Sequence, residues 1–249
     1  SLTRLPAEIG ELNKLINLFL SSNQLDSLPI EIGKIRNLQK LSLAINCFDN
    51  ITDSIGSLRD LRYLNLNKNK FKNVPPAIQL LTSLESLYLK YNQLDSLPKE
   101  IGNLKNLTIL GLDDNRLRSL PKELVNLTKL KSLELSKNPL YNVPAEVWKL
   151  KELLYLTLNN DSLSNLPAQI GEMDKLSNLS LNNNQFKSLP KEIGKLKNLK
   201  ILGLANNQLT ALPAEMAGLD NLKTLNLKGN LIQEPEKERI KKLLPKCKV

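Results

Sequence analysis

Histidine is absent from the sequence, and cysteine occurs only twice, at Cys47 and Cys247. Without histidine or a Cys-x-x-Cys pair, the sequence offers neither a usual zinc ligand set nor a Ser–His or Cys–His pair that activates a nucleophile. The glycine-rich patterns that bind nucleotide phosphates are also missing. The acidic neighbours Asp113 and Asp114 adjoin an expected strand, where adjacent side chains diverge and make a poor acid–base pair. We therefore expect no enzyme activity, no metal site and no cofactor.

Aromatic residues make up only 4% of the chain, and long apolar runs are lacking. No run approaches the roughly 20 residues that cross a bilayer, so we expect no transmembrane segment. Lys and Arg outnumber Asp and Glu by 35 to 25, an excess that suits a solvated basic surface or a polyanion partner. Because acids stand among the lysines, as in residues 191–198, we interpret the charge as a solvated surface and expect no nucleic-acid partner.

One pattern fills the chain: Leu-x-x-Leu-x-Leu-x-x-Asn-x-Leu. It recurs every 23 residues without insertion or deletion, a period typical of stacked-repeat proteins. Alternation in Leu-x-Leu predicts a short strand with its leucines on the buried face. A partial copy comes first, and we expect its start to precede Ser1, so a missing signal peptide says nothing about compartment. Ten further units begin at residues 15, 38, 61, 84, 107, 130, 153, 176, 199 and 222.

Each unit carries two more signals. Its ninth position is Asn, whose amide can bond backbone groups left unpaired where the chain leaves the strand. Asp161 takes this place once, and we expect a local irregularity there. The following Leu-Pro-x-Glu-Ile-Gly-x-Leu predicts one or two turns of 3-10 or α-helix, with its Gly position in ordinary helical conformation. In the second unit Ile51-Thr52 replaces Leu-Pro and predicts a looser turn.

The last residues change period. Ile240, Leu243 and Leu244 follow helical spacing between Pro235 and Pro245. A solenoid needs capped ends, because each repeat covers the core of its neighbour. We therefore predict a repeat solenoid over residues 1–232 and an amphipathic capping helix within residues 233–249.

With its units aligned, the sequence resembles the leucine-rich repeat family over nearly its whole length. Its sequence at residues 189–199 and 238–247 is similar to that of the 23-residue bacterial subfamily found in leptospiral spirochaetes. The resemblance implies an α/β horseshoe solenoid, with a parallel β-sheet on the concave face and short helical turns on the convex face. It also implies a secreted or surface-exposed bacterial protein that binds a host cell-surface or matrix protein. A cytoplasmic scaffold of the same fold is the alternative.

Residues between the strand leucines should face outward and form the binding surface. Four of the five tyrosines fall there, and we expect a diagonal contact between Tyr63 and Tyr88. Aromatic anchors with a charged rim are typical of binding hot spots, although tyrosine also suits exposed strands that bind nothing. The predicted partner-binding residues are Phe19, Ile45, Tyr63, Lys68, Tyr88, Lys90, Tyr91, Asp113, Asp114, Arg116 and Tyr155.

Other surfaces leave alternatives open. The outward positions from residue 153 onward are rich in asparagine, which suits a polar spacer or a carbohydrate-binding surface. Trp148 either packs beneath the neighbouring helical turn or marks a second contact. Polyanion binding, to nucleic acid or glycosaminoglycan, is the functional alternative from another class, and its affinity would fall steeply with salt.

Overall fold

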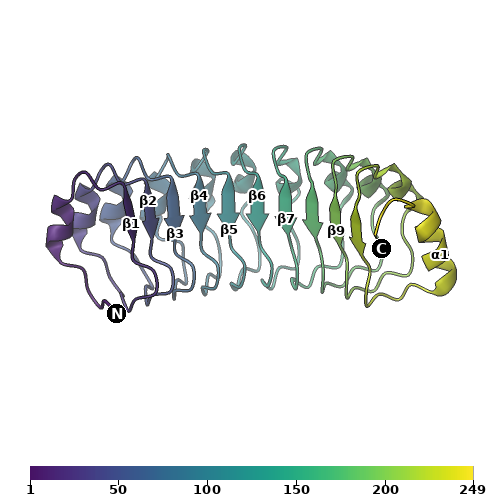
Figure 1. The fold of residues 1–249 in the computed structure, drawn as a ribbon, viewed down its shortest axis with the longest axis horizontal. Helices are drawn as coiled ribbons and strands as arrows, with labels where there is room; N and C mark the ends of the chain where they lie inside the picture. Colours follow the sequence, from purple (N-terminus) through teal and green to yellow (C-terminus); the bar gives the residue numbers. More distant parts are fainter. Residues whose placement is uncertain (249) are drawn as a thin grey trace. The chain divides into compact units, whose positions relative to one another are not determined.

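The computed structural model describes residues 1–248. Its contacts divide the chain into two compact units, Ser1–Leu130 and Lys131–Val249. Parallel strands of three residues follow one another in chain order within each unit (Figure 1). The first unit contains β1 (Asn17–Phe19), β2 (Lys40–Ser42), β3 (Tyr63–Asn65), β4 (Ser86–Tyr88) and β5 (Ile109–Gly111). The second contains β6 (Ser132–Glu134), β7 (Tyr155–Thr157), β8 (Asn178–Ser180), β9 (Ile201–Gly203) and β10 (Thr224–Asn226).

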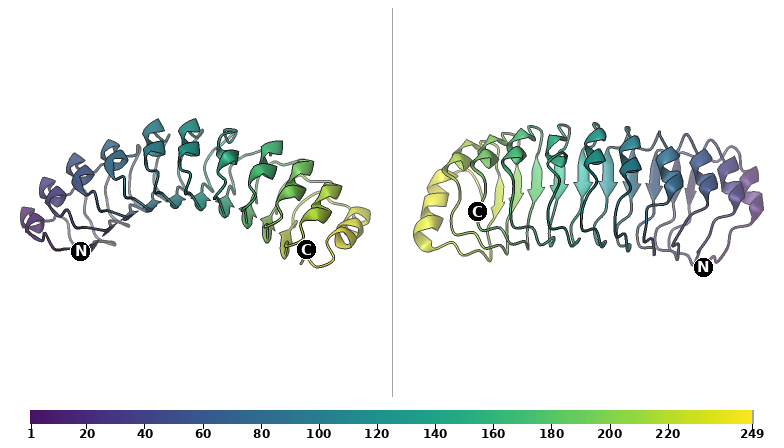
Figure 2. Two further views of the ribbon diagram at one scale, coloured as in Figure 1. Left: turned by 90° about the horizontal axis from the view of Figure 1, so that it is seen from above. Right: turned by 180° about the vertical axis from the view of Figure 1, so that it is seen from behind.

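A short 3-10 helix follows on the side away from the strands in each repeat (Figure 2). This is the solenoid that the repeat pattern predicts. The first unit contains η1 (Ala7–Glu11), η2 (Ile30–Lys34), η3 (Asp53–Ser57), η4 (Pro76–Leu80), η5 (Lys99–Asn103) and η6 (Lys122–Asn126). The second contains η7 (Val147–Lys149), η8 (Ala168–Glu172), η9 (Lys191–Lys195) and η10 (Ala214–Gly218).

The looser turn expected in the second repeat is wrong. Its helix η3 has five residues, like most of the others, and Thr52 precedes it at φ −57° and ψ 141°. Proline directly before most of the other helices fixes a similar φ, as Pro29 does at −65°. Threonine reaches this conformation without the ring, so the turn keeps its shape.

The glycine position of these helices serves close packing between repeats. A Cβ on Gly33 would lie 2.5 Å from the carbonyl oxygen of Ser54, and one on Gly102 would lie 2.5 Å from that of Glu123. Both glycines lie within 3-10 helices, η2 and η5, so the expectation of ordinary helical conformation is confirmed. Glycine here lets the backbones of neighbouring helices approach each other.

The core of each unit consists of stacked leucines and a ladder of buried asparagines. Asn92 shows the pattern of the ladder. Its Nδ2 donates to the carbonyl oxygens of Leu66 and Leu89, both at 3.0 Å, and its Oδ1 accepts from the N–H of Phe71 at 3.2 Å. The amide therefore satisfies backbone groups of two repeats at once, as the sequence predicts.

The repeat around Asp161 departs from this ladder, which confirms the expected irregularity. The buried carboxylate accepts from the N–H of Asn138 at 2.7 Å through Oδ1. Asn184 then accepts from the N–H groups of both Asp161 and Leu163, at 3.2 and 3.0 Å. Ser162 adds a second left-handed residue to this repeat, at φ 60°. A carboxylate cannot donate, so the surrounding backbone rearranges around an acceptor.

Helix α1 (Glu234–Leu243) closes the second unit, as predicted. Its Ile240 is buried, and Glu236 Oε1 accepts from the N–H of Leu212 at 3.0 Å. The following chain covers the outer edge of β10, because the carbonyl of Lys248 accepts from the N–H of Leu225 at 2.8 Å. The boundary expected at residue 232 stays a prediction. Within residues 1–248, no helix is long and apolar enough to cross a membrane.

Candidate functional site

A pair of tyrosines lies at the centre of the outward strand face of the first unit. Tyr63 on β3 is in register with Ser86, and Asn65 is in register with Tyr88 on β4. The two tyrosines are therefore diagonal neighbours, and their ring centroids lie 5.5 Å apart with the planes tilted by 51°. This geometry confirms the predicted contact and is favourable for aromatic rings. The Nδ2 of Asn65 also donates to the hydroxyl of Tyr63 at 3.2 Å.

Tyr91 extends this pair into the turn that follows β4. Its side chain is 47% exposed, and the Nζ of Lys68 lies 5.3 Å from its ring centroid. At this distance the ammonium group is attracted to the negative face of the ring. We refer to Tyr63, Tyr88 and Tyr91 as the tyrosine cluster.

Gly111 makes room for the cluster, and sequence reasoning missed it. It is in register with Tyr88 on the next strand. A Cβ there would lie 3.1 Å from Cδ1 of Tyr88 and 2.8 Å from Cε of Lys90, so a side chain would displace one or both. The signal was present in the sequence, because only Gly111 and Gly203 place glycine at the fifth position of a repeat.

The predicted charged rim is partly neutralised within the protein. Lys90 Nζ lies 2.9 Å from Oδ2 of Asp113, and both side chains are mostly buried. The N–H of Lys90 donates to Oδ1 of Asn67 at 2.7 Å. Asp114 is half-buried in the next turn, whereas Arg116 is exposed. The ion pair supports the cluster from one side, while Lys68 and Arg116 present charge to solvent.

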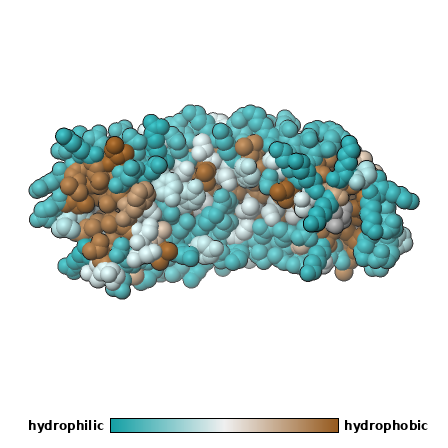
Figure 3. Space-filling view, viewed as in Figure 1, coloured by the Kyte–Doolittle hydropathy of each residue, from teal (hydrophilic) through white to brown (hydrophobic). Residues whose placement is uncertain are grey.

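Three predicted residues lie apart from the cluster. Phe19 is 64% exposed on β1, and the register places it three strands from Tyr88, about 14 Å away at ordinary strand spacing. Apolar surface gathers around this end of the first unit (Figure 3). Ile45 lies in the turn after β2. Tyr155 belongs to the second unit, on β7, where it lines a shallow depression with Lys175 and Lys200.

The outward face of the second unit is a network of polar side chains. Oδ1 of Asn159 accepts from Ser180 Oγ and from the N–H of Asn182, both at 2.8 Å. Oδ1 of Asn182 accepts in turn from the N–H of Ala205 at 2.8 Å. These amides bond one another and the backbone, which favours the polar-spacer interpretation over a carbohydrate-binding surface.

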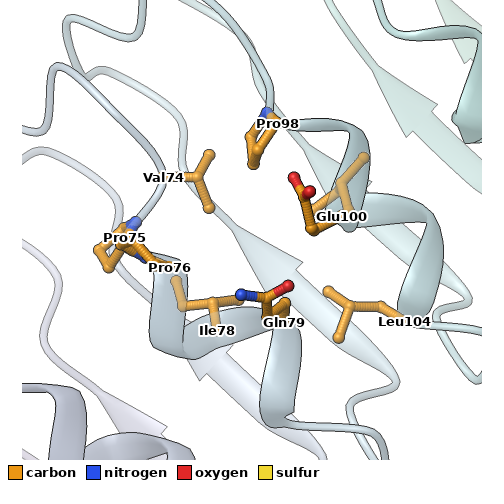
Figure 4. A pocket seen from close by; sticks show the side chains of 9 residues that line it. Val74, Pro75, Pro76, Ile78, Gln79, Pro98, Glu100 and Leu104 are labelled. Atoms are coloured by element: carbon orange, nitrogen blue, oxygen red, sulfur yellow. The ribbon is translucent and has the colours of Figure 1, made fainter.

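A pocket of about 240 Å³ opens between η4 and η5 on the helical side of the first unit (Figure 4). Gln79 occupies the position that is glycine in most of these helices. In those helices the glycine lies close to the backbone of the next helix, whereas in η4 a glutamine side chain takes up that space. Pro75, Pro76 and Pro98 form rigid walls, and Glu100 lies at the rim. The pocket is therefore a packing consequence of one substitution in the repeat.

Trp148 on η7 is buried. The alternative of a second contact surface at this residue is wrong, because its ring packs into the core. Within residues 1–248, no three His, Cys, Asp or Glu side chains come together as metal ligands.

The outward face of the first unit offers a partner the aromatic rings of the tyrosine cluster and the positive charges of Lys68 and Arg116.

Comparisons with known proteins agree with this architecture. Residues 44–117 and 99–185 match a model described as leucine-rich repeat region, and residues 174–232 match one described as leucine rich repeat. No curated protein matches the sequence. A solved leucine-rich repeat protein from Leptospira interrogans is 43% identical, with a TM-score of 0.87; the match covers 100% of this chain and 69% of that one.

Two further solved structures match at lower identity. The plant peptide hormone receptor RGFR1, in complex with RGF2, is 34% identical over 92% of this chain and 38% of its own, with a TM-score of 0.81. A chain of the Toll–Spatzle complex from Drosophila is 26% identical over 93% of this chain and 32% of its own, with a TM-score of 0.83. The chain thus spans well under half the length of either matched chain.

Proposed function

The chain belongs to the leucine-rich repeat family, and from this premise we propose that it binds a protein partner through the tyrosine cluster of its first unit. The leucine-rich repeat fold is a protein-interaction module and generally a non-enzymatic scaffold. The receptor RGFR1 was solved in complex with RGF2, and the other matched chain belongs to the Toll–Spatzle complex. Support for the cluster as the contact surface comes from the site itself.

The observation that carries the proposal is the fixed arrangement of three outward rings, of which Tyr91 is exposed and Tyr63 and Tyr88 are half-buried. Tyr63 and Tyr88 lie 5.5 Å apart, and Lys68 holds a position over Tyr91. Gly111 provides the space in which Tyr88 lies. Rings already ordered before binding lose little conformational freedom on association, so their burial contributes more to affinity. The second unit instead bonds its polar side chains to one another.

We also propose that this chain comes from a bacterial protein that is secreted or exposed at the cell surface, and that its partner is a host cell-surface or matrix protein. Its likeness to the leptospiral protein supports a bacterial origin. Location is tested separately, by antibody labelling of intact and permeabilised cells. Labelling of intact cells agrees with surface exposure. Labelling that requires permeabilisation, with none of the protein in the medium, favours a cytoplasmic scaffold.

The binding proposal is tested by paired capture from mammalian cell-surface and matrix extracts. The baits are the wild-type chain, the Tyr88→Ala/Tyr91→Ala variant and a Tyr141→Ala control, at low and physiological salt. Tyr141 is 67% exposed and lies outside the strands. We expect a protein that wild type and control retain and that the double variant loses.

Equal capture by all three baits that disappears with salt would contradict the tyrosine site. Such a result would favour polyanion binding by the basic surface instead, because binding to nucleic acid or a similar polyanion is strongly salt-dependent.

A further inference from the structure

The eighth position of every repeat adopts left-handed backbone as the chain leaves the strand, with φ between 54° and 75°. Left-handed backbone is unfavourable for most side chains, is tolerated by asparagine and aspartate, and suits glycine best. In the second unit the residues in this position are Lys137, Asn160, Asn183, Asn206 and Gly229. In the first unit they are Ser22, Ile45, Lys68, Tyr91 and Asp114.

Stacking of the repeats imposes this conformation whatever the side chain. The N–H of Ile45 donates to the carbonyl of Asn67 at 2.8 Å, and its carbonyl accepts from the N–H of Asn23 at 3.2 Å. The N–H of Tyr91 likewise donates to the carbonyl of Asp113 at 2.9 Å. At Ile45 and Tyr91 the backbone is therefore bonded to a neighbouring repeat, and the residue type decides how much strain the turn stores.

Ile45 and Tyr91 are the least suitable residues in this row. A β-branched side chain at φ 57° is a rare outlier, and a bulky ring at φ 56° is also disfavoured. Burial does not compensate for the strain, because the two side chains are 48% and 47% exposed. Residues kept in strained conformations and held open to solvent point to a contact function.

The charges on this surface indicate the chemistry of the partner. Lys68 lies between Ile45 and Tyr91 in the row, is exposed, and places its ammonium group over the Tyr91 ring. Lys40 on β2 is exposed on the same face. Lys90 is paired with Asp113, so it adds little charge. Half-buried Asp114 bounds the row on one side. The surface is thus apolar and cationic.

We propose that Ile45, Lys68 and Tyr91 form a contact ridge for an acidic, apolar segment of a protein partner, and that Ile45 and Tyr91 set its specificity at the expense of stability. This inference rests on the proposed function and places the decisive contacts in the turns. The partner's apolar side chains pack on Ile45 and Tyr91, and its carboxylate pairs with Lys68.

The stability half of the proposal is tested by thermal melting, without any partner. Ile45→Asn and Tyr91→Asn each relieve left-handed strain and should raise Tm by about 2–4 °C. Ile201→Asn and Tyr155→Asn are matched controls, because their side chains are 44% and 47% exposed on strands. Both controls should leave Tm unchanged or lower it, since isoleucine and tyrosine suit strands. Equal effects in the two pairs would overturn the inference.

The binding half is tested by panning a phage library of random peptides on four immobilised baits: wild type, Ile45→Asn, Ile201→Asn and Tyr88→Ala. Wild type and Ile201→Asn should enrich peptides that combine acidic and apolar residues, and Ile45→Asn should lose at least tenfold of that enrichment. Enrichment of basic peptides, or of none, by wild type contradicts the inference.

The Tyr88→Ala bait separates the two proposals. Loss of enrichment with Tyr88→Ala but not with Ile45→Asn would leave the tyrosine cluster as the site and refute the ridge. Retention by both variants would refute binding at this face altogether. Loss with Ile45→Asn, together with a raised Tm for that variant, supports the ridge.

Discussion

The two units share one framework and differ in what they expose. Both bury leucines and asparagines at the same repeat positions, as Asn92 and Asn184 illustrate. The first unit groups three tyrosines on its outward face and places Ile45 and Tyr91 in left-handed turns, whereas the second joins its outward amides into a network around Asn159 and Asn182. Buried positions therefore specify the repeat, and the outward positions are free to specialise. We propose that the first unit is the one specialised for contact.

The largest expected effect tests the shared framework. Asn92→Leu and Asn184→Leu each leave buried backbone groups of two repeats without partners. Each change should lower the stability of its unit by about 3 kcal/mol or more, because each unpaired buried group costs about 1–3 kcal/mol. Thermal melts followed by circular dichroism measure the loss, with exposed Asn165→Leu as control. Similar Tm values for all three variants would show that the ladder does not support the fold.

A smaller effect is expected from the packing of the helices within the first unit. Gly102→Ala places a Cβ 2.5 Å from the carbonyl oxygen of Glu123 and should cost about 1–3 kcal/mol through overpacking. Gln79→Ala, at the same position of η4, should change stability little, because the pocket beside it already separates η4 from η5. A neutral Gly102→Ala variant would contradict the account of glycine as a packing requirement.

The next prediction compares the two glycines at the fifth repeat position. Gly111→Ala should displace Tyr88 or Lys90 and reduce partner capture several-fold, with little change in Tm. Gly203→Ala places its Cβ nearest to Asn182 in the second unit and should leave capture unchanged. Quantitative capture assays with both variants measure the difference. Equal capture by Gly111→Ala and wild type would mean that the position of the rings is unimportant.

The smallest effect concerns the cap of the second unit. The hydrogen bond from Arg239 lowers the pKa of Glu236 below its ordinary value of 4.5, and the N–H of Leu212 adds to the effect. A lowered folded-state pKa contributes stability that is present above the ordinary pKa and is lost as pH falls through the folded value.

Melts of wild type and Glu236→Gln between pH 7 and pH 2 should therefore show a modest Tm advantage for wild type at neutral pH. That advantage should disappear as the medium becomes more acidic than pH 4.5. A Tm advantage that does not change with pH would show that the charge of the Glu236 carboxylate does not stabilise the cap.

Sequence periodicity predicts the framework because one buried pattern repeats with a fixed interval. The strands, the helices, the asparagine bonds and the contact between Tyr63 and Tyr88 all follow from the positions of residues within a repeat. Left-handed backbone at Ile45 and Tyr91 could not be predicted in this way. It accompanies hydrogen bonds between repeats, and isoleucine and tyrosine are residues that disfavour it.

The grouping of the candidate site was less predictable. The repeat pattern predicts Phe19 as part of one binding surface with the tyrosines, but the register separates it from Tyr88 by two intervening strands. The role of Gly111 is not predicted from the sequence, because a residue without a side chain offers no contact group of its own. Distances across the sheet depend on the strand number as well as on the position within the repeat.

The central claim is that the tyrosine cluster binds a protein. The most direct measurement is the dissociation constant of the captured protein for wild type and for Tyr88→Ala, at low and physiological salt. We predict affinity at least tenfold weaker for Tyr88→Ala, about 1.4 kcal/mol or more, with only moderate salt dependence for wild type. Equal affinities of wild type and Tyr88→Ala for the captured protein, both falling steeply with salt, would contradict the claim.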